Sequence, residues 1–173
     1  MKKTLLILIV TLFATIAANG QNLFFIGEKS YPCTETFTLE SNSNSRLNDL
    51  DILIAKDGTK GLFVVSIETI KGMLIRGKLI IYLDDGTVIT CIDKGKYDYV
   101  DNVATTVYYL TADQLTKMKN NNINTVRYTL KCRDCYYSSD KGNFSASNNA
   151  NLIGKYVVSE KTDVPTLINN LFN

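Results

Sequence analysis

Four cysteines offer the widest choice of chemistry in this sequence, and they stand at Cys33, Cys91, Cys132 and Cys135. Cys132 and Cys135 have the C-x-x-C spacing of disulfide-exchange enzymes and of zinc sites. In a thioredoxin-like enzyme the motif begins a helix, whose dipole lowers the pKa of the first thiol. Here residues 136–139 (YYSS) and a Gly- and Asn-rich stretch follow, and they predict no helix. We therefore expect a structural disulfide between Cys132 and Cys135, with thiol–disulfide chemistry as the alternative.

The roles of Cys33 and Cys91 stay open, because four cysteines allow three complete pairings. A four-cysteine zinc site would need both of them to converge on the C-x-x-C pair. One C-x-x-C and two single cysteines are a weak zinc signature. Cys91 lies within an expected strand, where it can equally be a buried free thiol. We expect neither a metal nor a cofactor.

Carboxylates gather at Asp84 and Asp85 and again at Asp93, Asp98 and Asp101. Two of them could serve a paired-carboxylate hydrolase, and several could bind calcium. No spacing singles out a pair, however, and the regular D-x-D-x-D-G calcium loop is missing. Aspartate is a common turn residue, so we interpret the set as solvated turns.

The stretch 94–102 (KGKYDYVDN) is the most suggestive candidate surface. Tyr97, Asp98, Tyr99 and Asp101 alternate there, and exposed tyrosines supply rigid, amphipathic contact area in recognition sites. We take these four residues as the candidate binding surface. The alternative is a hairpin crossing whose tyrosine rings fold back onto a sheet.

Two residue types are missing altogether, since the sequence contains no histidine and no tryptophan. This excludes Ser-His-Asp and Cys-His nucleophilic machinery in its usual form and every histidine-containing zinc site. No block of lysine or arginine follows residue 20, so nothing indicates nucleic-acid binding. We expect a domain that is not an enzyme and that binds a protein or glycan partner. An inhibitor of an extracellular enzyme is a further alternative.

Short runs rich in Ile, Val, Thr, Tyr and Phe predict strands throughout the chain. They lie at 34–39, 51–55, 62–67, 78–83, 87–92, 105–110 and 125–131, with a weaker run at 155–159. The polar stretches 40–49 and 141–151 are expected loops. The pattern predicts a mainly β (α+β) fold, either an antiparallel β-sandwich or a barrel-like domain.

The clearest hairpin joins 78–83 to 87–92. Asp-Gly at 85–86 predicts a two-residue type I′ turn, which places Leu83 opposite Val88 and Tyr82 opposite Ile89. Both faces of that ribbon would be apolar. We therefore expect it to be central in the fold and covered on each side.

Two short helices complete the predicted fold. Thr111 and Gln114 have the spacing of a capping box, which predicts a helix that begins after Thr111. Near the C-terminus, Asp163 precedes apolar residues at helical spacing: Val164, Leu167, Ile168, Leu171 and Phe172. We expect this amphipathic helix to dock on its own domain; an external partner is the alternative.

The block 80–130 resembles a segment of small, uncharacterised exported bacterial proteins. The shared features are the turn at 83–86 (LDDG), the helix start at 109–111 (YLT) and the strand start at 123–127 (INTVR). These motifs are architectural and cover less than a third of the chain. The resemblance implies a β-rich domain that is not an enzyme, and it assigns no site residue.

Residues 1–20 are predicted to be a cleavable signal peptide. Lysines at 2–3 precede an apolar run at 5–16, and Ala18 and Gly20 form a small-x-small site before Gln21. The apolar run is too short for a membrane-spanning helix, so we expect no membrane span after cleavage. We expect the protein to be exported to the periplasm, the cell surface or the medium.

Removal of the leader leaves 21–173, about 150 residues, which fits a single β-rich domain. The formal charge of +2 belongs to the two leader lysines, so the net charge of the remainder is close to zero.

Overall fold

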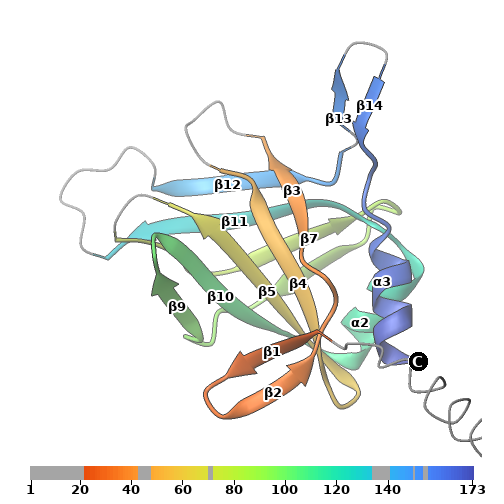
Figure 1. Ribbon diagram of the computed structural model, residues 1–173, viewed down its shortest axis with the longest axis horizontal. Coiled ribbons are helices and arrows are strands. Elements are labelled where there is room, and N and C mark those ends of the chain that lie inside the picture. Colours follow the sequence, from red (N-terminus) through yellow and green to blue (C-terminus); the bar gives the residue numbers. More distant parts are fainter. Residues whose placement is uncertain (1–21, 43–47, 70–71, 134–140, 150, 154–155) are drawn as a thin grey trace, which may run out of the picture.

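Antiparallel strands form one curled sheet in the computed structural model, which describes residues 22–173 except 43–47, 70–71, 134–140, 150 and 154–155 (Figure 1). The expected leader at 1–20 lies outside the described residues. The sheet has ten strands, and their bounds are β3 Phe37–Ser41, β4 Leu50–Asp57, β5 Lys60–Glu68, β6 Met73–Ile75, β7 Leu79–Leu83, β8 Val88–Cys91, β9 Tyr97–Val100, β10 Val103–Leu110, β11 Ile123–Cys132 and β12 Gly142–Ser147. Their order is β8-β7-β11-β12-β3-β4-β5-β10-β9, and β6 pairs with β11 in line with β7. The mainly β, barrel-like prediction is confirmed.

The curl of the sheet brings β10 against β6 and β8, although no ladder joins β10 to either strand. Side chains of β10 cross this seam instead. The Thr106 hydroxyl donates to the Ile75 carbonyl at 2.7 Å, and the Tyr108 hydroxyl donates to the Gly77 carbonyl at 3.1 Å. Both side chains are completely buried. Two side-chain hydrogen bonds therefore hold the half-barrel in its curl.

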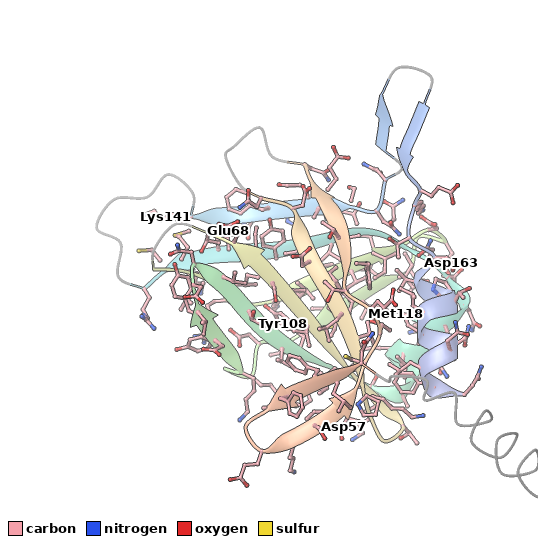
Figure 2. The ribbon with its side chains drawn as sticks, in the orientation of Figure 1. Asp57, Glu68, Tyr108, Met118, Lys141 and Asp163 are labelled. Carbon is pink, nitrogen blue, oxygen red and sulfur yellow. The ribbon has the colours of Figure 1, made fainter. Side chains whose placement is uncertain are left out.

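The interior of the curled sheet is the main hydrophobic core. Side chains alternate along each strand, so that Ile52 and Ile54 of β4 and Phe63 and Val65 of β5 point inward and are fully buried. Tyr108 of β10 joins them, and Figure 2 shows it among the strands of the sheet. The expected strands at 51–55, 62–67 and 105–110 owe their apolar character to this core.

A second, smaller cluster lies on the outer face of β4, β5 and β10. It contains Ala55, Leu62, Val64 and Val107. The two-stranded hairpin of β1 (Leu23–Ile26) and β2 (Lys29–Pro32) covers it with half-buried Phe24, Ile26 and Tyr31 (Figure 1). This hairpin was not predicted from the sequence, and it extends the buried surface to both faces of the sheet at this point.

Two helices close one end of the half-barrel, α2 (Ala112–Asn120) and α3 (Val164–Phe172) (Figure 1). The predicted capping box is present, since the Thr111 hydroxyl accepts from the Gln114 N–H and the Gln114 side chain accepts from the Thr111 N–H. The predicted terminal helix is present as well. Its residues Val164 and Ile168 are fully buried in the main core, so α3 docks on its own domain.

The β7–β8 hairpin differs from the prediction by one residue of register. Tyr82 lies opposite Val88, and Ile81 lies opposite Ile89. The loop has three residues, 84–86, because the Leu83 N–H donates to the Thr87 carbonyl at 2.9 Å. In the described part of this loop only Gly86 has a positive φ, at 84°, which fits a three-residue loop with a left-handed glycine. The predicted type I′ turn is wrong.

This slip reverses the two faces of β8, as a shift of one residue must. Ile89 and Cys91 point into the core, whereas Val88 and Ile92 are exposed. β8 is also an end strand of the sheet. The prediction of a central ribbon covered on both sides is therefore wrong.

The polar stretch 141–151 was expected to be a loop, but most of it forms strands. β12 lies between β11 and β3 in the middle of the sheet. A small ribbon of β13 (Asn151–Ile153) and β14 (Tyr156–Ser159) follows and projects from the body (Figure 1). The weaker expected run at 155–159 corresponds to β14.

Candidate functional site

The predicted surface at 94–102 is largely an edge strand. β9 pairs with β10 alone and forms one end of the sheet. Asp101 and Asn102 connect the two strands with φ values of 51° and 67°. Positive φ at both central residues is the type I′ geometry. This turn was expected at 85–86 and occurs here instead, which gives Asp101 a turn position.

Alternation along β9 divides the four predicted residues. Tyr97 and Tyr99 lie opposite Thr106 and Ala104, whose side chains face the interior. Tyr99 is half-buried against the main core, as the alternative interpretation of this stretch described. Tyr97 remains 41% exposed. Asp98 belongs to the outer face, so the structure does not bring the four residues together on one surface.

Asp98 also protects the free edge of β9. Its carboxylate accepts a hydrogen bond from the Tyr99 N–H at 2.8 Å. In the antiparallel register, the backbone groups of Tyr99 point away from β10. An edge strand with unpaired donors invites pairing with another chain. Asp98 therefore accepts a hydrogen bond from one of the backbone donors at this edge, while it remains part of the strand.

An apolar groove of about 640 Å³ lies on the outer face, between the β1–β2 hairpin and the β9–β10 pair. Its exposed apolar residues are Phe25, Val100 and Val103, at 62%, 56% and 37%. Half-buried Phe24 and Ile26 continue the lining. Exposed apolar side chains that share one concavity differ from the scattered single ones common on any surface. We refer to this site as the apolar groove.

Sequence reasoning missed the groove because its two sides are about 75 positions apart in the chain. Phe25 follows the predicted leader, while Val100 lies beside the predicted tyrosines. The run Leu23–Ile26 carried a signal, since it is apolar and lies in the predicted mature chain. Of the four predicted residues, Tyr97 and Asp98 line the groove.

The side chain of Arg76 packs against the ring of Tyr97, near the seam where β10 meets β6. The guanidinium lies 4.4 Å from the ring centroid, within the range of a cation–π contact. The Arg76 Nε also donates to the Asp93 Oδ2 at 2.7 Å. Arg76 therefore orients the ring of Tyr97, and Arg76 is itself fixed by Asp93.

Asp93 is the most densely bonded of the predicted turn carboxylates. Besides Arg76, its oxygens accept from the Gly77 N–H at 3.0 Å and from the Gly95 N–H at 2.7 Å. Partial burial opposes ionisation of this carboxyl. The hydrogen bonds and the Arg76 charge outweigh that effect and hold the pKa of Asp93 below its usual range. The group ties the β6–β7 junction to the segment that follows β8.

The other predicted carboxylates also have structural partners. Asp84 forms an ion pair with Lys161 at 2.6 Å, which lowers the pKa of its carboxyl. Asp85 accepts from the Thr87 N–H inside the β7–β8 turn. Among the described residues, no three Cys, Asp or Glu side chains are placed to share a metal ion.

Cys33 and Cys91 are both free and buried. Burial raises the pKa of the Cys91 thiol to about 12 and also raises that of Cys33. The two lie in different hydrophobic clusters, on the two faces of the sheet, which contradicts a zinc site that contains both. Cys132 ends β11, and Cys135 lies outside the described residues, so the disulfide of Cys132 with Cys135 stays a prediction.

Comparison with protein-family models, with curated proteins and with solved structures gave no match. Over the residues that the structure describes, no helix has the length and apolar character needed to cross a bilayer.

Proposed function

We propose that this protein is a non-catalytic, exported binding domain whose partner docks in the apolar groove. The observation that carries the proposal is the exposure of Phe25, Val100 and Val103 in one concavity of about 640 Å³. Water contact at such a surface is unfavourable by roughly 25 cal/mol per Å² of apolar area. A partner that covers the groove recovers that free energy.

The chemistry of the groove favours a protein segment over a glycan as the partner. Half of its lining residues have aliphatic or phenylalanine side chains, and the chain has no tryptophan. Sugars need hydrogen-bonding groups for their hydroxyls, whereas apolar side chains of a protein need only a fitting surface. Lys96 and Asp98 in the lining supply a polar rim.

Export supports the same proposal. The predicted leader directs the domain out of the cytoplasm, and the absence of histidine removes the commonest hydrolytic machinery from the sequence. A domain of this kind acts through surfaces, and the apolar groove gathers Phe25, Val100 and Val103 from among the exposed apolar side chains of the described residues.

The test compares two valines of nearly equal exposure on the two end strands of the sheet. Val100 is 56% exposed in the groove and Val88 is 53% exposed on β8. We expect Val100→Asp to lower retention of partner proteins on the immobilised mature domain by at least about tenfold, because a charge would be desolvated on docking. Val88→Asp should leave retention unchanged.

Tyr97→Ala provides a second readout at the rim of the groove and should weaken retention to a smaller extent. Thermal unfolding of every variant checks that the fold is intact. Equal retention by the parent and by Val100→Asp would refute the proposal, and so would an equal loss for Val88→Asp.

A further inference from the structure

A second concavity, of about 500 Å³, lies at the β6–β7 junction and the end of β11. Tyr97 lines both this concavity and the apolar groove. The two differ in chemistry, because four of the residues around the second one are cations: Arg76, Lys78, Lys131 and Arg133. We call it the basic pocket.

The positive charge of the basic pocket is only partly compensated by its described lining. The carboxylate there is that of Asp93, and its oxygens already accept from Arg76, Gly77 and Gly95. Neither Lys78 nor Lys131 forms an ion pair with another described residue. Within the described part of the chain, these two ammonium groups therefore remain open to an anion.

The pocket is also preformed. Arg76 is fixed by its 2.7 Å bond to Asp93 and by the ring of Tyr97. Binding an anion would therefore cost little additional side-chain entropy at this residue. Leu74 gives the lining a buried apolar part at 4% exposure, while Ile92 is 66% exposed. Charged groups thus surround a surface that suits an apolar or ring-shaped body.

We propose that the basic pocket binds an organic anion, whose phosphate or carboxylate group pairs with Lys78, Lys131 and Arg76 and whose body rests on Leu74 and Ile92. Charge-assisted hydrogen bonds to such oxyanions are the strong ones in proteins. The volume lies within the range of small-molecule sites. This site does not depend on the function proposed for the apolar groove.

One further cation lies beside the end of β11. An adjoining hollow shares Lys131 and Arg133 with the basic pocket and adds Lys141. Figure 2 places Lys141 at the end of the sheet away from the helices. An anion with more than one charged group can therefore contact both hollows.

Calorimetric titration of the mature protein with phenyl phosphate tests the site. We expect a dissociation constant below about 1 mM at low salt. The affinity should weaken as the sodium chloride concentration rises, because salt screens the attraction between the anion and the cations of the pocket. The double variant Lys78→Gln/Lys131→Gln should bind at least about tenfold more weakly. Lys29→Gln/Lys60→Gln, which removes two exposed lysines outside the pocket, should bind as the parent does.

Two outcomes overturn the proposal: no binding of phenyl phosphate at about 10 mM, a concentration that would detect even a weak site, or equal loss in both double variants. A third comparison tests the organic body. Ile92→Ser should weaken phenyl phosphate but leave inorganic phosphate unaffected, since only the former places a ring on that side chain. Equal affinity of Ile92→Ser and the parent for phenyl phosphate would refute this part.

Discussion

At the scale of single residues, Asp93 has a structural role that the sequence did not distinguish from those of the other turn carboxylates. Its side chain is only 9% exposed and accepts from two backbone N–H groups and from Arg76. It thereby orients Arg76, which in turn contacts Tyr97 between the apolar groove and the basic pocket. One carboxylate therefore positions residues of both candidate sites.

We predict that Asp93→Asn lowers the free energy of unfolding by about 1–3 kcal/mol at pH 7, since buried hydrogen bonds to a charged acceptor are lost. Urea unfolding measures the change. Asp57→Asn, which changes an exposed carboxylate at the end of β4, should stay within about 0.5 kcal/mol of the parent. A similar loss for both variants would contradict the role of Asp93.

The pH dependence of this effect has a definite sign. The folded-state pKa of Asp93 is lowered, so the ionised group stabilises the fold fully above its unfolded pKa of about 3.9. This contribution disappears as the pH falls through the lowered folded-state value. The difference in stability between parent and Asp93→Asn should therefore be constant from pH 7 to about pH 5 and shrink below about pH 4.

At the scale of elements, α3 carries a second prediction. Ile168 is completely buried in the core, whereas Asn170 on the same helix is exposed. We expect Ile168→Ala to lower the free energy of unfolding by about 2–5 kcal/mol because it leaves a cavity. Asn170→Ala should change it by less than about 0.5 kcal/mol. Chemical denaturation of both variants distinguishes a docked helix from a helix held only by an external partner.

Local signals were sufficient to predict the two helices. The capping box at Thr111 and Gln114 involves residues three positions apart, and the apolar face of 164–172 repeats at helical spacing. Both patterns specify their element without reference to the rest of the fold. Most of the strongly apolar strands were predictable for the same reason.

Features that depend on distant partners, or on a choice between two permitted turns, were not predictable. The register of β7–β8 follows from a three-residue loop, which an Asp-Gly pair also permits. β12 has a polar outer side, where Asn143 accepts from the Thr129 hydroxyl, and only Phe144 and Ala146 face inward. Its polar composition concealed a strand in the middle of the sheet.

At the scale of the whole molecule, the helices and the candidate sites occupy different ends of the half-barrel. α2 and α3 close one end, and β9 lies at the other side of the sheet (Figure 1). Both concavities meet at Tyr97 of this edge strand. Of the predicted surface, Tyr97 and Asp98 belong to the groove, whereas its other side comes from a hairpin that the sequence analysis did not identify.

Site-specific photo-crosslinking shows whether a partner docks in the apolar groove. A photoreactive amino acid replaces Val100 in one variant and Val88 in another, since both positions are exposed on end strands. The producing cells are irradiated, and adducts are identified by mass spectrometry. We expect one dominant partner protein attached at position 100 and none at position 88. Equal adducts at both positions, or none at position 100, would contradict it.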